Sequence, residues 1–402
     1  MLVIGQLLFT ITPSYHLFIR LLLNMNKTVI WVVVLIVVVG GIVMFSGKSA
    51  PTETGPIKIG VIAPMTGDAA AYGEPMANVL RMAVEEVNAT GGVDGRLMEL
   101  IVEDGKCSGA SGTSAAQKLV NVDGVKAIIG GFCSGETIPA VPIVAAAKVV
   151  MVSGGASSPD LTGISPYFFR TNPSDSAQGK VLAQIAYNDK GWRKVAFLQE
   201  QTDYALGIYK AFNEEFVRLG GSTTNESFAS NVTDVRGVIT KAKATNPDAL
   251  FISAQTPAVV SRVLTQVSQS NWKPALMVND VVPGDPELLK NSSALLEGAL
   301  TAEFGTNPQN PKFQTLVNNY KAKYGSEPPF QSYAQTMYDA VYLLKEGLAK
   351  AGEDGEKLAQ WSRTIKNWDG ASGKITILES GDRDSGHTMK VIRGGKVELY
   401  TK

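Results

Sequence analysis

Three stretches of the chain share one pattern, in which a short apolar run passes directly into glycine, serine and threonine. They are 57–67 (IKIGVIAPMTG), 126–134 (KAIIGGFCS) and 149–158 (VVMVSGGASS). The apolar runs have the length and the β-branched content of strands that are buried on both faces. The sequence therefore predicts three parallel strands, each of which ends at small or hydroxylated residues.

Segments with helical spacing alternate with these strands. A helix is expected at 75–90, with Pro75 in its first turn and two glycines after its end. A strand follows at 97–102, a helix at 113–122 with Leu119 and Val122 facing inward, and a helix at 138–147. Strands that alternate with helices in this way predict βαβ units and a parallel sheet.

A second series of strands and helices begins near residue 195. Strands are expected at 195–198, 223–228, 249–253 and 275–279, and helices at 207–219, 234–244 and 258–269. Two later helices, 310–324 and 332–351, and two short strands, 374–378 and 389–392, complete the pattern. Two such series in 402 residues predict an α/β protein with two doubly wound parallel-sheet lobes.

The small residues at the strand ends indicate a ligand crevice. In an open α/β sheet, ligands bind beyond the carboxyl ends of the strands. Hydroxyl and free N–H groups at such ends can bind an anion such as a carboxylate. Ordinary turns use the same residues, but three occurrences, each before a helical pattern, favour the crevice. Asp280 follows the strand expected at 275–279 and is either a turn residue or the counter-charge of a ligand ammonium.

The N-terminal part of the chain carries a membrane signal. Residues 29–45 (VIWVVVLIVVVGGIVMF) are apolar and uncharged, and Lys27 precedes them. Segment 25–46 is expected to be an uncleaved transmembrane helix with Lys27 on the cytoplasmic side. A cleaved signal peptide, which would release a periplasmic form, is the alternative. Segment 47–55 is expected to be a linker, and 1–24 an extension of the gene model before a start at Met25, or a second membrane segment.

Composition excludes several classes of partner and site. The chain has 37 basic and 37 acidic residues and no basic cluster, so nucleic acid is not an expected partner. Two histidines and two cysteines without CxxC spacing argue against a metal site. An extracytoplasmic location favours a disulfide between Cys107 and Cys133, with two free buried thiols as the alternative.

The sequence gives little support to catalysis. It contains no nucleophile elbow, no zinc-protease motif and no phosphate-binding loop of the Walker type. The run 382–387 (DRDSGH) holds Asp, Ser and His side by side, but neighbours in a turn do not take up triad geometry by adjacency. A solvated polar turn is the interpretation adopted for this run.

Five segments, taken in order, resemble one known family. They are IKIGVIAPMTGDAAAYGEPMANVLRMAVEEVNATGGVDGRLMELIVED, IIGGFCSGETIPAVPI, SGGASSPDLT, FFRTNPSDSAQG and EQTDYALG. Their order is similar to that in the branched-chain amino-acid-binding proteins, the type I periplasmic solute receptors of Leu/Ile/Val ABC importers. The resemblance runs from about residue 57 to the C-terminus, and the two cysteines match the disulfide positions of the family.

The resemblance implies a fold and a function. The fold is the type I periplasmic-binding-protein fold, with three crossovers between a first lobe of 56–174 and 304–379 and a second lobe of 175–303 and 380–402. The function is an extracytoplasmic receptor without enzymatic activity or cofactor, which closes on an amino acid and delivers it to an ABC permease with its ATPase subunits. A monomer is expected. A membrane-tethered sensor with the same binding module is the alternative.

The resemblance also assigns site residues by position. Ser134 matches the hydroxyl that holds the ligand carboxylate, Gly155 a residue that binds through its backbone, and Ser157 a residue that is usually Thr. Tyr72 and Tyr204 match aromatic residues of the cleft.

Two further site positions depart from the pattern of the family. Asp280 stands where these receptors carry an ammonium-binding Glu, so the charge is kept and the reach is shorter. Gln255 stands where Tyr is frequent and makes the pocket more polar or roomier. An α-amino acid is therefore expected, and its side chain is left open.

Overall fold

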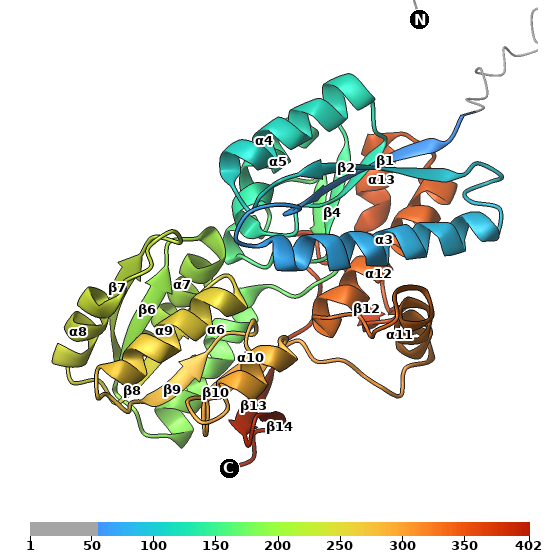
Figure 1. The fold of residues 1–402 in the computed structure, drawn as a ribbon. Helices are drawn as coiled ribbons and strands as arrows, with labels where there is room; N and C mark the ends of the chain where they lie inside the picture. Colours follow the sequence, from blue (N-terminus) through green and yellow to red (C-terminus); the bar gives the residue numbers. More distant parts are fainter. Residues whose placement is uncertain (1–54) are drawn as a thin grey trace, which may run out of the picture. The chain divides into compact units, whose positions relative to one another are not determined.

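The computed structural model describes residues 55–402, and Figure 1 shows their elements. The transmembrane helix, the preceding segment and nearly all of the linker expected at the N-terminus lie outside the described residues. No helix in 55–402 has both the length and the apolar character needed to cross a membrane.

Five strands form the first sheet, and all of them run parallel in the order β2-β1-β3-β4-β5. The strands are β1 (Ile57–Ala63), β2 (Met98–Asp104), β3 (Ala127–Gly130), β4 (Val150–Ser153) and β5 (Phe168–Arg170). The helices between and beside them are α3 (Ala70–Ala89), α4 (Gly109–Lys118) and α5 (Ser134–Ala146). The three strands with small residues at their ends are parallel, as the sequence predicts, and they lie side by side as β1, β3 and β4.

Both faces of the first sheet are covered by helices. Ile59 and Val61 of β1 pack in the apolar core that contains α3, whereas Ile62 packs in the core that contains α4 and α5. This alternation follows from the two-residue repeat of a strand. At Gly60 an added Cβ would lie 2.9 Å from Leu119, so the glycine lets that leucine pack against the sheet.

Seven strands form the second sheet, in the order β14-β13-β10-β9-β8-β6-β7. The strands are β6 (Lys194–Glu200), β7 (Ser222–Phe228), β8 (Ala249–Ser253), β9 (Ala275–Val278), β10 (Leu300–Glu303), β13 (Thr388–Arg393) and β14 (Lys396–Leu399). The helices are α6 (Asp175–Gln184), α7 (Asp203–Arg218), α8 (Arg236–Ala244), α9 (Pro257–Gln269) and α10 (Pro286–Asn291). β6 to β10 are parallel, and β13 and β14 pair antiparallel at one edge.

The last third of the chain contributes to both cores. Helices α11 (Pro311–Tyr324), α12 (Gln331–Ala351) and α13 (Gly355–Ser362) pack in the core of the first sheet, although they follow β10 in sequence. Figure 1 shows α12 beside α3. The small β11 (Trp368–Gly370) and β12 (Gly373–Ile375) pair with each other, and β13 then returns to the second sheet.

Several helices begin earlier than the sequence predicts. α3 starts at Ala70, so Pro75 lies inside the helix and not in its first turn. Buried Tyr72 and Met76 are four residues apart and extend the apolar face toward the N-terminus.

α4 ends at Lys118, and Val122 is 76% exposed, which corrects its expected inward position. The expected elements did not include β5, α6, α10, α13, β10, β11 or β14.

The run 382–387 is only partly solvated, which corrects the interpretation from sequence: Asp384 and Gly386 are exposed, whereas Asp382 and Arg383 are buried. The Arg170 side chain is fully buried and donates from Nε to Asp382 Oδ1 at 2.8 Å, and Nη2 also lies 2.6 Å from this oxygen. Arg383 is buried and donates from Nη1 to the carbonyl of Thr171 at 2.8 Å. Charged residues are tolerated inside a protein when each has a partner, and this pairing is not visible in a linear pattern.

The Arg170–Asp382 pair yields a first prediction. Arg170→Met leaves the Asp382 carboxylate enclosed without its cation, so the free energy of unfolding should fall by about 3–5 kcal/mol. Lys210→Met breaks the exposed pair with Asp160 and should cost less than about 1 kcal/mol. Urea unfolding followed by tryptophan fluorescence compares the two variants. Equal losses would contradict the assignment of a structural role to the buried pair.

Candidate functional site

The ends of β3 and β4 place three serine and glycine positions close together. Ser134 is the first residue of α5, and its Oγ accepts the N–H of Ser158 at 3.1 Å. Gly155 and Ser157 follow β4, and the Ser157 hydroxyl donates to Asp175 Oδ2 at 2.7 Å. All three are buried. Hydroxyl oxygens and a helix N-terminus thus meet at one edge of the first sheet, where an anion is favoured.

Asp280 follows β9 of the second sheet and is held by three side chains. Its Oδ1 accepts from the hydroxyl of Tyr204 on α7 and from Gln178 Nε2 on α6, the latter at 2.8 Å. Its Oδ2 accepts from the hydroxyl of Tyr333 at 2.6 Å. Tyr333 belongs to α12, which packs in the core of the first sheet. The hydrogen bond from Tyr333 to Asp280 therefore joins the two sheets.

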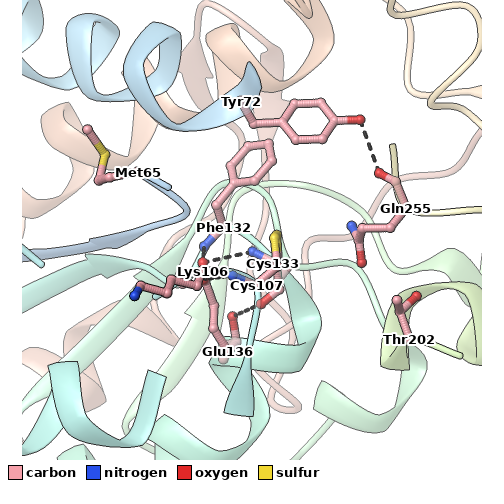
Figure 2. The surroundings of a disulfide bond; sticks show 12 residues. Met65, Tyr72, Lys106, Cys107, Phe132, Cys133, Glu136, Thr202 and Gln255 are labelled. Carbon is pink, nitrogen blue, oxygen red and sulfur yellow. Dashed lines mark hydrogen bonds between the residues drawn. A yellow bond between two sulfur atoms is a disulfide. The ribbon is translucent and has the colours of Figure 1, made fainter. Parts of the chain in front are cut away.

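Aromatic rings form a wall beside these polar groups. The centroid of Tyr72 lies 5.2 Å from that of Phe132 and 4.5 Å from that of Phe330. Its hydroxyl donates to the carbonyl oxygen of Gln255 at 3.2 Å, a contact that Figure 2 shows. Gln255 thus meets Tyr72 through its backbone, and this hydrogen bond is a second link between residues of the two sheets.

Burial sets the protonation of the site. It raises the pKa of Tyr72, Tyr204 and Tyr333 well above the ordinary value, and the charge of Asp280 adds to the effect in each case. Burial, followed by the charge of Asp280, also raises the pKa of Asp175. At neutral pH the phenols therefore remain neutral hydrogen-bond donors.

The seven residues that the sequence assigns to a site line two small cavities, of about 10 Å³ each. The first, here called the aromatic cavity, is lined by Tyr72, Phe132, Cys133, Ser134, Gly155, Tyr204, Gln255, Val281 and Tyr333. The second, here called the polar cavity, is lined by Ser157, Asn172, Pro173, Asp280, Phe304, Ser332, Tyr333 and His387. Tyr333 lines both, so the cavities adjoin each other.

A disulfide joins Cys107 and Cys133, as the sequence predicts, and fixes the loop before α5. Figure 2 shows Glu136 next to it. The Glu136 carboxylate accepts N–H groups of Phe132 at 2.7 Å, Cys107 at 2.9 Å and Cys133 at 3.1 Å. The two sulfurs are bonded to each other, so they cannot act as thiolate metal ligands.

Four site residues were not expected from sequence: Gln178, Asn172, Tyr333 and His387. Tyr333 precedes Met337 by four residues and extends by one turn the apolar face expected for this helix, and His387 lies in the polar run. Only the approach of distant segments brings them to Asp280 and Ser157. The one local signal was the exceptional density of polar residues in FFRTNPSDSAQG, which contains Asn172 and Gln178.

Comparison with known proteins identifies the family. The family described as "Periplasmic binding protein" matches residues 56–396. This chain belongs to that family. Its α/β architecture of two parallel-sheet lobes is consistent with the type I periplasmic binding fold.

Relatives of known name cover most of the chain. The "Leucine-, isoleucine-, valine-, threonine-, and alanine-binding protein" of Pseudomonas aeruginosa is 29% identical over 344 residues, which is 84% of this chain and 89% of the relative. The Leu/Ile/Val-binding protein of Escherichia coli is 26% identical, over 81% of this chain and 88% of its own length.

Solved structures agree with this family membership. A leucine-binding protein of Thermotoga maritima has a TM-score of 0.78 and 29% identity, and the match covers 86% of this chain and 98% of that one. A branched-chain amino acid transporter substrate-binding protein of Streptococcus pneumoniae, in complex with isoleucine, has a TM-score of 0.74 and 27% identity over the same shares.

Glu136 beside the disulfide yields a second prediction. Burial outweighs the three N–H contacts and raises its pKa to about 7, whereas the unfolded chain releases this proton near pH 4.3. Between these values the folded state holds the proton and the unfolded state does not, so stability falls as the pH rises. The fall from pH 5 to pH 8 should be about 2–3 kcal/mol larger in the wild type than in Glu136→Gln.

Chemical denaturation at pH 5, 6, 7 and 8 measures this difference. Glu99→Gln, which changes an exposed carboxyl group on β2, is the control and should keep the pH profile of the wild type. Parallel profiles for the wild type and Glu136→Gln would show that Glu136 does not titrate in this range.

Proposed function

We propose that this protein is the extracytoplasmic solute receptor of an ABC importer and that it binds an α-amino acid between its two lobes. The observation that carries the proposal is the meeting of Ser134, Ser157 and Asp280 around adjoining cavities. A zwitterion needs hydroxyl or N–H donors for its carboxylate and an anionic acceptor for its ammonium. These residues supply both.

The carboxylate end of the ligand is assigned to Ser134. Its hydroxyl and the N-terminus of the 13-residue helix α5 favour a negative charge there. Gly155 allows close approach of the backbone after β4, whereas Ser157 lines the polar cavity together with Asp280. Asp280 provides the negative charge for the ammonium, with Tyr204 and Tyr333 fixing the orientation of its carboxylate.

The side chain of the ligand is assigned to the aromatic cavity. Tyr72, Phe132 and Tyr204 give it an apolar wall, and Gln255 adds a polar edge. The Pseudomonas aeruginosa and Escherichia coli relatives are named as binding leucine, isoleucine and valine, and the former also as binding threonine and alanine. A branched-chain amino acid or one of similar size is the proposed ligand.

Binding is proposed to proceed by hinge closure of two lobes, 56–174 with 304–379 and 175–303 with 380–402. The chain then crosses between lobes three times. Cavities of about 10 Å³ hold a single water molecule at most, so an amino acid enters only when the lobes separate. The closed form is proposed to dock on the membrane permease, whose ATPase subunits drive import, and the receptor is proposed to act as a monomer.

Asp280 gives the third prediction. Asp280→Asn keeps the shape of the side chain and removes the charge that pairs with the ammonium. In a closed cleft the loss of binding free energy should be about 2–5 kcal/mol, which corresponds to an increase in Kd of at least roughly 30-fold. Titration calorimetry with L-leucine, L-isoleucine, L-valine, L-threonine and L-alanine measures it.

The matched control is Asp234→Asn, which removes an equal charge from an exposed ion pair with Arg236. Its affinity should stay within about twofold of the wild type, because exposed charges far from a site are screened. An Asp280→Asn variant that binds amino acids as tightly as the wild type would contradict the proposal that the natural ligand is an α-amino acid.

Attachment to the membrane is the fourth prediction. We propose that 29–45 is an uncleaved anchor and that the receptor works at the outer face of the cytoplasmic membrane. The membrane fraction should then contain a protein that keeps this segment, as N-terminal sequencing would establish. A soluble product that begins near Ala50 would instead indicate a cleaved signal peptide and a freely diffusing periplasmic receptor.

A further inference from the structure

The polar cavity next to Asp280 contains more hydrogen-bond acceptors than the expected site residues explain. Ser157 and Asp280 were expected there, whereas Asn172 and His387 were not. Both unexpected residues are enclosed, since Asn172 is 3% exposed and the His387 side chain is 2% exposed. Buried polar atoms normally have partners, so unpaired ones at this place call for an explanation.

Three residues with hydroxyl groups line this cavity, Ser157, Ser332 and Tyr333, and the hydroxyl hydrogens of Ser157 and Tyr333 are already engaged. The Ser157 hydroxyl donates to Asp175 at 2.7 Å, and the Tyr333 hydroxyl donates to Asp280 at 2.6 Å. What Ser157 and Asp280 still offer to a ligand is therefore oxygen lone pairs. A carboxylate accepts about four hydrogen bonds, and three positions of Asp280 are taken.

The amide of Asn172 also presents an acceptor. Its Nδ2 donates to the carbonyl of Gly155 at 3.2 Å and to that of Pro173 at 3.4 Å. Both partners are acceptors only, so the orientation of the amide is fixed by its surroundings. Its Oδ1 then finds no hydrogen-bond partner among residues 55–402.

His387 adds no competing positive charge. Burial is the main cause that lowers its pKa to about 4, so the ring is neutral at neutral pH. Its Nδ1 is also without a hydrogen-bond partner in the described part of the chain. The polar cavity thus offers acceptor oxygens from Asn172, Ser157 and Asp280 beside the hydroxyl of Ser332 and a neutral imidazole, and it carries a negative charge from Asp280.

We infer that this cavity receives the primary ammonium of the ligand and that Asn172 Oδ1 is its third acceptor, beside Asp280 and Ser157 Oγ. This inference rests on the proposed function. An ammonium group carries three N–H donors. Asn172, Asp280 and Ser157 line one cavity, and each carries an oxygen with capacity to accept one of them. Pairing with the ligand satisfies the buried oxygen of Asn172, which is otherwise unpaired.

The arrangement makes Asn172 a determinant of ligand class. A ligand with a hydroxyl in place of the ammonium offers one donor, and its binding leaves acceptors unpaired in a closed cavity. Sites built to pair a polar group reject analogues that lack it more strongly than apolar pockets reject a missing methylene. The cavity therefore selects primary amines over 2-hydroxy acids of the same shape.

Two substitutions of Asn172 separate its donor from its acceptor. Asn172→Ala and Asn172→Asp both remove the Nδ2 contacts to Gly155 and Pro173, but only the aspartate keeps an oxygen at the ligand. Calorimetry with L-valine should show a Kd about 10- to 100-fold weaker for Asn172→Ala, the value of a hydrogen bond to a charged group. Asn172→Asp should bind within about threefold of the wild type or more tightly.

A ligand pair provides the second measurement. L-valine is compared with L-2-hydroxy-3-methylbutanoate, in competition if needed, on the wild type and both variants, whose melting temperatures are recorded. The preference for valine should fall about tenfold in Asn172→Ala. Equal losses of valine affinity in the two folded variants, with an unchanged preference, would show that Asn172 only supports the backbone and would overturn the inference.

The same experiment separates this inference from the proposed function. A wild type that binds L-valine, with Asn172 variants that lose affinity equally, rejects the role of Asn172 and leaves the receptor intact. A wild type that binds none of L-valine, L-leucine, L-isoleucine, L-threonine or L-alanine rejects the proposed function, and the inference with it.

Discussion

A half-buried carboxylate between two sheets is stabilised by hydrogen-bond donors, and Asp280 takes its donors from three helices. Gln178 and Tyr204 belong to α6 and α7, which pack with the second sheet, whereas Tyr333 comes from α12 in the core of the first. The stabilisation of the ionised Asp280 carboxylate therefore depends on how closely the two sheets approach each other. This one residue couples the charge in the site to the relative position of the lobes.

The scaffold supplies rigidity around this coupling. The disulfide and the three N–H contacts of Glu136 hold the loop that leads into Ser134. On the other side of the site, the buried Arg170 joins β5 to Asp382 near the C-terminus. Glu136 and the Arg170–Asp382 pair are polar groups that are costly to bury. They are tolerated because each of them has hydrogen-bonding or charged partners. Fixed strand ends thus face a carboxylate whose surroundings change with closure.

The parts of the fold that local pattern determines could be predicted. The runs that end in Gly and Ser at 57–67, 126–134 and 149–158 became β1, β3 and β4, because buried parallel strands have a strong apolar signature. Short elements such as β5 and β10 were missed, since three or four residues carry too little periodicity. Helix starts shifted where apolar contacts extended the first turn, as in α3.

Tyr72 on α3 and Tyr204 on α7 were assigned by the family resemblance. Position in the fold alone predicts a site residue only where it follows the end of an expected strand. Ser134, Gly155, Ser157 and Asp280 do so, and topology brings such positions together. Tyr333, Asn172 and His387 reach the cavities from a helix, a connecting segment and the polar run before β13. Their roles depend on pairings more than 50 residues apart, such as Tyr333 with Asp280. No window of sequence contains both members of such a pair.

The hydroxyls that orient Asp280 also compete with the ligand. A carboxylate with three of about four acceptor positions filled has room for one N–H of an ammonium. A ligand of the proposed class would therefore use the remaining position or displace Tyr333, and displacement would break the hydrogen bond that joins the sheets. Sharing is favoured, because an ammonium that uses the last position adds attraction without opening the cleft. In the proposed binding mode the other two N–H groups then need acceptors away from Asp280, and the polar cavity offers the oxygens of Ser157 and Asn172 for this role.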